Sequence, residues 1–291
     1  MDHNCQNDSN KSSIVVATSI APRNIDIQKQ AIYSWLSLGF DVVSLNCKEE
    51  IDTLNGLFPG VRFVESVRDG RHLFGRPYVF LDELLLLLSR MNGRCVGIVN
   101  SDIIFKGPRE FYDFLEINTQ DAVVFGSRVD VDTTKDDIGS FYERGFDFFF
   151  MNSDSITDFP NSIACIGVTW WDYWLPLIWL LRGNRLKYLA TPFAYHVRHP
   201  YRWSKEQWEQ LAEMVRDYLL EKRKNSICYT DELRIIDNFE NVLLKNSKRF
   251  LKIPILPKKS RARIAYRYTN RFGLSVLSFI LQASEVLEYP S

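Results

Sequence analysis

The N-terminal part of the chain places an amphipathic segment between two short apolar runs. Residues 14–18 and 40–45 have the length and the β-branched content of buried strands. Residues 25–38 carry apolar side chains at helical spacing, and Gly39 follows, a residue typical of helix C-termini. A strand, a helix and a second strand in this order form a crossover between parallel strands. The chain therefore begins as an α/β fold.

The rest of the sequence extends this pattern into one large domain. Further strands are predicted at residues 61–65, 96–99, 122–125, 146–151 and 186–189, with 163–168 either a strand or a loop. Helices are predicted at residues 78–91, 109–115, 170–181, 205–222 (with Ser204 as N-cap), 230–244 and 260–287. Residues 68–77, 130–137 and 195–203 are predicted as loops. The predicted fold class is α/β, with a Rossmann-like, mixed but mainly parallel sheet flanked by helices and a helical C-terminal extension. We expect the chain to divide into a disordered N-terminal segment at residues 1–13, the domain at residues 14–245 and a basic amphipathic tail at residues 246–291.

Charge is unevenly distributed, although the formal net charge is zero. Between Lys245 and Arg271 there are ten basic residues and no acidic residue. From Arg261 onward, apolar residues recur every three or four positions among these charges, which is typical of an interfacial helix. We expect this tail to contact a membrane surface, with packing on the domain or on a second subunit of a homo-oligomer as the alternatives.

Other sequence features predict where in the cell the protein is located. The five cysteines are dispersed and form no CxxC pair, which argues against a disulfide framework or a zinc site. Residues 1–13 lack an apolar signal core, and no run reaches the about 18–20 apolar residues of a spanning helix. We expect a cytoplasmic protein, peripheral on the inner membrane face. Neutral charge and the lack of a recognised motif argue against nucleic-acid binding.

The segment from Cys95 to Phe105 carries the main chemical signal. An apolar run ends abruptly at Asn100-Ser101-Asp102, which places a carboxylate at the C-terminal end of a buried strand. Ligands of open α/β sheets bind at that end, and carboxylate oxygens suit a divalent cation that carries a diphosphate. Asp130-Val131-Asp132 is a competing acidic motif. We favour Asn100 and Asp102, because there the strand runs straight into the carboxylate.

Three further segments supply candidate site residues. The loop after the first strand contains Thr18, Ser19, Ile20 and Arg23, whose hydroxyls, backbone N–H groups and guanidinium suit phosphate binding. Asp172 is flanked by Trp170, Trp171 and Tyr173, and desolvation among them would raise its pKa toward that of a general base. His196, Arg198 and His199 form a cluster in a chain with four histidines.

The order of these features resembles that of GT-A fold glycosyltransferases across roughly residues 14–203, with Asn100 in place of the first Asp of their Asp-x-Asp signature. The resemblance implies that Thr18, Ser19, Ile20 and Arg23 grip the nucleotide and that the loop with Asp69 and Arg76 closes on base and ribose. It implies that Asn100, Ser101 and Asp102 meet the metal and diphosphate, with Mn²⁺ or Mg²⁺ bound by Asp102 and by His196 or His199. Alternatively, Arg198 and the histidines clamp the diphosphate. Asp172 would be the catalytic base.

The function that follows is a metal-assisted transferase. We expect it to move a hexosyl or pentosyl group from a nucleotide-sugar donor, a UDP-sugar by preference, to a glycan or lipid-linked acceptor in polysaccharide or glycolipid synthesis. Asp172 favours inversion, although retaining enzymes of this fold need no base there. A sugar-phosphate nucleotidylyltransferase is one alternative, but such enzymes usually have a Gly-rich first loop, and the loop from Ser19 to Arg23 has none. A non-catalytic binding module with a decayed metal site at Asn100 is another.

Overall fold

The computed structural model describes residues 14–91, 94–200, 204–225 and 258–290. Its centre is an eight-stranded sheet in the order β12-β10-β6-β9-β4-β1-β2-β3. The strands of this sheet are β1 Val15–Thr18, β2 Asp41–Asn46, β3 Val61–Glu65, β4 Cys95–Val99, β6 Ala122–Gly126, β9 Phe148–Asn152, β10 Arg185–Leu189 and β12 Glu285–Leu287. Strand β9 is antiparallel to β4 and β6, and every other neighbouring pair is parallel. The predicted mixed, mainly parallel sheet is confirmed.

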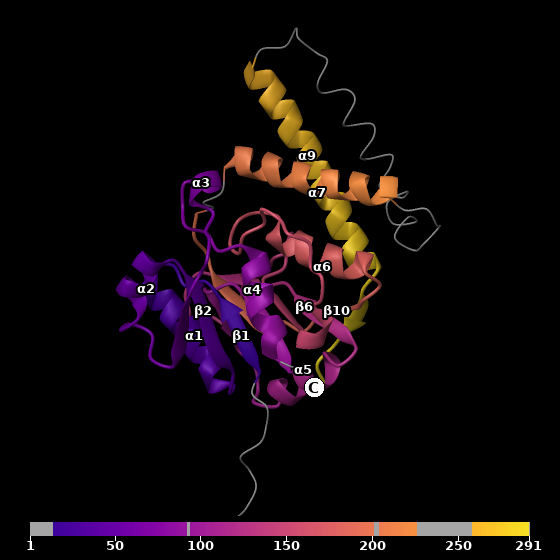
Figure 1. Ribbon diagram of the computed structural model, residues 1–291. Helices are drawn as coiled ribbons and strands as arrows, with labels where there is room; N and C mark the ends of the chain where they lie inside the picture. The colour runs from indigo at the N-terminus through magenta and orange to yellow at the C-terminus, as the bar shows by residue number, and fades with distance from the viewer. Residues whose placement is uncertain (1–13, 92–93, 201–203, 226–257, 291) are drawn as a thin grey trace, which may run out of the picture.

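Helices cover both faces of the sheet (Figure 1). They are α1 Ile25–Ser37, α2 Lys48–Leu54, α3 Arg71–Phe74, α4 Leu81–Leu88, α5 Phe111–Asn118, α6 Trp171–Leu181, α7 Lys205–Asn225 and α9 Lys258–Gln282, with short 3₁₀ turns at Ser89–Met91 and Ser153–Ser155. On β1, Val15 and Ala17 join the core formed with α4 and α6, whereas Val16 joins the core formed with α1 and α5. This alternation follows from the two-residue period of a strand. It explains why β4 and the first three residues of β1 carry no polar side chain, since both faces of these strands are buried.

A second sheet lies at the edge where the site is found. It contains β5 Ile103–Phe105, β11 Ala194–Val197, β7 Val129–Val131 and β8 Ser140–Phe141, in that order. The predictions of loops at residues 130–137 and 195–203 were therefore wrong for their first residues. Strands of three or four residues give too short a pattern to recognise, and these become strands by pairing with each other across the chain.

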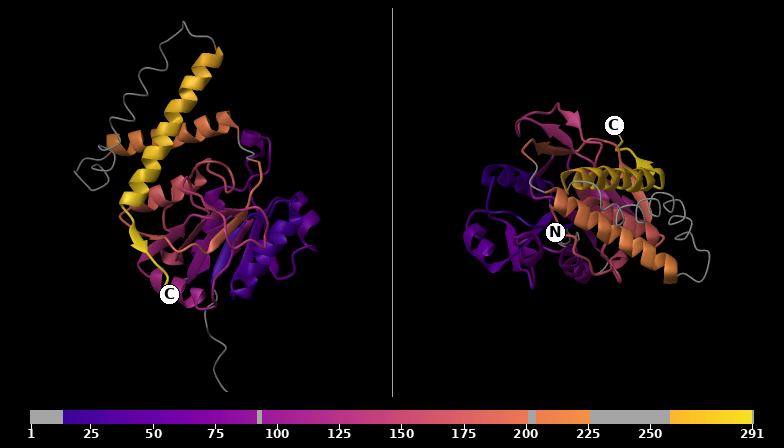
Figure 2. Two further views of the ribbon diagram at one scale, coloured as in Figure 1. Left: turned by 180° about the vertical axis from the view of Figure 1, so that it is seen from behind. Right: turned by 90° about the horizontal axis from the view of Figure 1, so that it is seen from above.

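Helices α7 and α9 cross over α6 on the outside of the domain (Figures 1 and 2). Helix α7 begins with a capping box, in which Gln207 N–H donates to Ser204 Oγ (3.2 Å) and Ser204 N–H donates to Gln207 Oε1 (2.9 Å). Phe272 and Val276 of α9 are buried against the main core. The apolar face of this half of α9 therefore packs on the domain, one of the alternatives expected for the tail.

The C-terminal helix ends earlier than predicted. It stops at Gln282, and residues Glu285–Leu287 form β12, which pairs in parallel with β10 at the sheet edge. Helices α2 and α3 were not predicted, because each is too short to show a periodic pattern. The helix predicted at 230–244 lies outside the described residues. Among those the structure does describe, no helix combines the length and apolarity that crossing a membrane requires.

Candidate functional site

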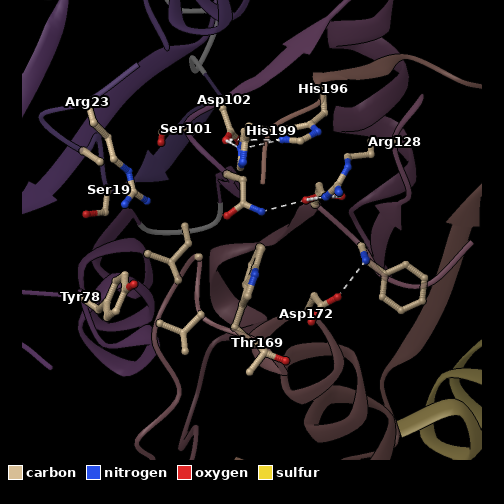
Figure 3. A pocket seen from close by; sticks show the side chains of 18 of the residues that line it. Ser19, Arg23, Tyr78, Ser101, Asp102, Arg128, Thr169, Asp172, His196 and His199 are labelled. Carbon is tan, nitrogen blue, oxygen red and sulfur yellow. Dashed lines mark hydrogen bonds and ion pairs between the residues drawn. The ribbon is translucent and has the colours of Figure 1, made fainter. Parts of the chain in front are cut away.

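One cavity of about 750 Å³ opens at the carboxyl ends of the parallel strands. Its wall includes Ser19 after β1 and the Asn100-Ser101-Asp102 triplet after β4. Segment 166–173 at the start of α6 and the end of β11 complete it. Figure 3 shows these side chains converging on one space from different elements. A cavity of this size and position is typical of a small-molecule site in an α/β fold.

Asp102, His196 and His199 form a three-residue cluster in this wall. Their ligand atoms all lie within 4.8 Å of one another. Asp102 Oδ2 lies 3.2 Å from His199 Nε2 and 3.7 Å from His196 Nε2, and the two Nε2 atoms are 3.1 Å apart. The antiparallel pairing of β11 with β5 sets His196 opposite Ile103, next to Asp102 in the chain. Long-range strand pairing thus brings Asp102 to two histidines that lie nearly a hundred positions later in the chain.

Electrostatics couple the members of this cluster. Burial disfavours protonation of His196, but hydrogen bonds with Asp102 and Asp130 outweigh that effect and raise its pKa to about 9. Burial opposes ionisation of Asp102, yet the two imidazoles hold the pKa of its carboxyl well below the ordinary range. Without a bound cation, the negative carboxylate is therefore balanced by a protonated histidine.

The Asp130 carboxylate contacts Nδ1 of His196, the ring nitrogen that does not face Asp102. The Asp130 Oδ1 atom lies 2.9 Å from His196 Nδ1, because the parallel β7–β11 register pairs these two residues. A proton held on Nδ1 by this carboxylate leaves Nε2 as the ring nitrogen that would bind a cation, an arrangement common for metal-binding histidines. Of the two competing acidic motifs, Asp102 belongs to the cluster and Asp130 orients one of its members. Asp132 is exposed and pairs with Arg198.

Asn100 is not a member of the cluster, but a chain of hydrogen bonds joins it to Asp130. Its Nδ2 donates to Asp147 Oδ1 (2.8 Å), and Arg128 Nη1 donates to both Asp147 oxygens (2.8 and 2.9 Å). Arg128 also donates to Asp130 Oδ1 (2.8 Å), and its guanidinium lies 4.2 Å from the centroid of the Tyr142 ring. An aspartate at position 100 would face the Asp147 carboxylate, so the amide has a structural reason to be there.

Asp172 lies in the first turn of α6 on another wall of the cavity. Its Oδ2 accepts a hydrogen bond from Phe146 N–H (3.2 Å). Burial, reinforced by the negative charge of Asp147, raises the pKa of Asp172 to about 7. The loop before it is strained, because Trp170 has φ 72° while its side chain is fully buried. Strain of this kind costs free energy and is often found at functional sites.

The other predicted residues divide into two groups. Ser19, Arg23, Arg76, Ser101 and Arg198 line the cavity with Asn100, Asp102, His196, His199 and Asp172. Thr18, Ile20 and Asp69 are not in its wall. The Ile20 N–H donates to Ser44 Oγ (2.9 Å), and Asp69 forms an ion pair with Arg71 (3.3 Å). These contacts direct the Ile20 N–H and the Asp69 carboxylate away from a ligand, since both polar groups already have partners within the protein.

Sequence reasoning missed several residues of the wall, namely Glu50, Arg128, Tyr142, Arg144, Asp147 and Trp208. Asp147 immediately precedes the aromatic strand β9, so a polar residue at a strand end was a usable signal. Trp208 comes from α7, and nothing in its local sequence distinguishes it from a core aromatic residue.

No protein-family model matches the chain, and no curated protein is similar to it. Among solved structures, it is similar to the mannosyltransferase PcManGT from Pyrobaculum calidifontis, in complex with GDP-Man and Mn²⁺ (12% identity, 93% of this chain and 85% of that chain, TM-score 0.47). It is also similar to a candidate glucose-1-phosphate thymidylyltransferase from Bacillus anthracis (13%, 60% and 85%, TM-score 0.41). A third is the inositol-1-phosphate CTP transferase from T. maritima (14%, 64% and 84%, TM-score 0.36). All three of these proteins are transferases by name.

Proposed function

We propose that this protein is a metal-assisted glycosyltransferase that takes a sugar from a nucleoside-diphosphate donor. One observation carries the proposal: a single cavity joins a cluster of metal-ligand side chains with a separate carboxylate whose pKa is raised to about 7. Metal-assisted inverting transfer from such a donor uses both functions, a cation for the leaving diphosphate and a base for the attacking hydroxyl. The cavity is large enough for a donor of this size.

The residues present fit a divalent cation. Asp102 offers a carboxylate oxygen, and His196 and His199 offer imidazole nitrogens at distances that one ion can bridge. A mixed oxygen and nitrogen set suits Mn²⁺, as well as other first-row metals. When bound there, the cation would neutralise negative charge on the diphosphate as it departs. Asp130 would keep His196 in the ligating tautomer.

The chain's own residues supply the proton transfer. Phe146 N–H holds Oδ2 of Asp172, which leaves Oδ1 to accept the proton of the acceptor hydroxyl. A pKa of about 7 suits a base, because the carboxylate is then populated at neutral pH and still attracts the proton. Attack on the anomeric carbon from the base side, opposite the leaving diphosphate, inverts the configuration. Trp208 in the adjoining wall offers aromatic surface to an acceptor glycan.

The acceptor is proposed to be a glycan or a lipid-linked glycan. The sequence between Lys245 and Arg271 carries ten positive charges without an acidic residue, which favours an anionic membrane surface near the acceptor. Sedimentation with vesicles of anionic and neutral phospholipid tests this part. Binding to neither kind of vesicle would remove the membrane contact and leave the transfer reaction unaffected.

The reaction itself is tested by incubating the full-length protein with a panel of nucleotide sugars, Mn²⁺ and glycan or lipid-linked acceptors, and measuring release of nucleoside diphosphate. Release that is lost in Asp102→Asn and Asp172→Asn variants would support the proposal. A parallel assay offers sugar 1-phosphates and nucleoside triphosphates. Pyrophosphate release there, with no nucleoside diphosphate in the first assay, would identify a nucleotidylyltransferase instead. Nucleotide binding without turnover in either assay would identify a binding module.

A further inference from the structure

One end of the cavity is lined by side chains that have no role in the transfer step proposed above. Ser19, Arg23 and Tyr78 lie there together, apart from Asp172, with the Asp102 cluster between the two ends (Figure 3). Glu50, which follows β2 on the first turns of α2, lines the same cavity and is close enough to Arg23 for their charges to interact. If the diphosphate lies at the cluster and the acceptor near Asp172, this end is where the nucleoside must lie.

The carboxylate of Glu50 is held rigidly by a buried chain of hydrogen bonds. Asn46 Nδ2 donates to Glu50 Oε2 (2.8 Å) and to the carbonyl oxygen of Ile20 (2.7 Å). Ser44 Oγ donates to Asn46 Oδ1 (2.7 Å), and Ser44 itself accepts from Ile20 N–H. Both Ser44 and Asn46 are fully buried. The orientation of the Asn46 amide is therefore determined, and Glu50 is presented in one position before any ligand arrives.

We propose that Glu50 recognises the guanine base of the donor, so that the substrate is a GDP-sugar. A carboxylate accepts hydrogen bonds and, when charged, donates none. Guanine alone among the common bases presents two adjacent donors, N1–H and N2–H, on one edge, and these match the two oxygens of a carboxylate. This inference rests on the proposed function, since it assigns the base of the donor. It replaces uridine, which the sequence resemblance favours.

The other bases fit this acceptor less well. Uracil and thymine place a carbonyl oxygen on each side of N3–H, and each oxygen would face a carboxylate oxygen. Cytosine and adenine place a ring nitrogen acceptor beside their amino group, with the same consequence. Burial and the negative charge of Asp69 raise the pKa of Glu50, and the Asn46 hydrogen bond and the positive charges of Arg23 and Arg71 partly oppose that rise. Selection then arises from repulsion of the wrong bases as well as attraction of guanine.

The test is calorimetric titration of the full-length protein with GDP, IDP and UDP in the presence of Mn²⁺. GDP should bind more tightly than UDP by roughly 5- to 150-fold, the range for a bidentate hydrogen-bonded pair. IDP lacks the N2 amino group and should fall between them. Glu50→Gln should weaken GDP and strengthen UDP, because the new amide donates at one of the two positions, where it opposes a guanine N–H and pairs with a uracil carbonyl oxygen. Glu49→Gln is the matched control, since Glu49 is exposed and pairs with Arg71.

The outcomes separate the two proposals. UDP binding as tightly as GDP, or equal GDP affinity in wild type and Glu50→Gln, would overturn the guanine assignment while leaving metal-dependent transfer intact. The comparison of GDP with IDP needs no variant, so it holds even if Glu50→Gln fails to fold. Asp102→Asn should reduce the affinity for both nucleotides without changing their ratio. No Mn²⁺-dependent binding of any nucleotide would overturn both proposals.

Discussion

Gly145 lies so close to Asp172 that a Cβ atom at position 145 would stand 2.4 Å from Asp172 Oδ2. The next residue, Phe146, donates its N–H to the same oxygen. The segment before β9 is thus a cradle for this carboxylate, and glycine is needed because any side chain would occupy the place of Oδ2. The segment that leads into the antiparallel strand β9 therefore positions the carboxylate that we propose as the base.

Gly145→Ala should therefore displace Asp172 and reduce the turnover number, while Mn²⁺ affinity stays at the wild-type level. Isothermal titration with Mn²⁺ and steady-state kinetics on the same preparation measure the two effects. Gly56→Ala is the control, since a Cβ there meets nothing within 4 Å. Equal turnover in Gly145→Ala and wild type would contradict a role for the observed Asp172 position.

The activity of the protein should depend on pH through Asp172. Because burial raises the pKa of this group to about 7, the base is protonated and inactive below that pH. The kcat/KM value should rise with pH through about 7 and then level off. Asp172→Asn should lower kcat by a factor on the order of 10²–10⁴. At pH 8 the Asp172 carboxylate of the folded wild type is ionised, although burial disfavours its charge. Asp172→Asn removes this charge, so the variant should melt at the same temperature as the wild type or at a higher one. A lower Tm would attribute the lost activity to unfolding.

Restoring an acidic residue at position 100 should harm the protein. Asn100→Asp would remove the donor to Asp147 Oδ1 and place two carboxylates side by side. We expect a loss of about 1–3 kcal/mol in the free energy of unfolding, measured in urea at pH 7.5. Unchanged stability together with tighter Mn²⁺ binding would place Asn100 in the metal site instead.

Asp130 should affect metal binding without touching the metal. Since its carboxylate orients His196 through Nδ1, Asp130→Ala should weaken Mn²⁺ binding by roughly 10- to 100-fold. Asp132→Ala is the matched control, because Asp132 is two residues away, exposed, and paired with Arg198. Equal Mn²⁺ affinities in the two variants would exclude an orienting role.

The C-terminal helix should be required for stability. Phe272 is buried and lies 5.4 Å from Trp170, measured between ring centroids. Phe272→Ala should cost about 3–5 kcal/mol of unfolding free energy. Leu274→Ala, at a position 44% exposed on the same helix, should cost much less. Similar urea midpoints for both variants would show that α9 is not part of the folded domain.

Local sequence patterns predicted the frame of this protein. The apolar runs that became β1, β3 and β4 and the periodic segment that became α1 are each long enough to show their period. A carboxylate directly after β4 and a pair of histidines after an apolar run were likewise visible. The sequence therefore indicated a parallel sheet with Asp102, His196 and His199 at its ligand-binding edge, and Asp172 elsewhere at that edge.

Only the tertiary structure decided how these groups act together. Pairing of β11 with β5 and β7 put Asp102 beside His196 and Asp130 behind it, and strands this short leave no periodic signal. The antiparallel pairing of β9 places Asp147 within hydrogen-bond distance of Asn100 and Arg128. Helix α2, which was not predicted, places Glu50 within hydrogen-bond distance of Asn46. Apart from the Asn46–Glu50 contact, these contacts join residues that are distant in sequence, and the free energy of all of them depends on burial and partners that no local pattern contains. Residue type thus determined which chemistry was available, and strand pairing determined which residues meet to perform it.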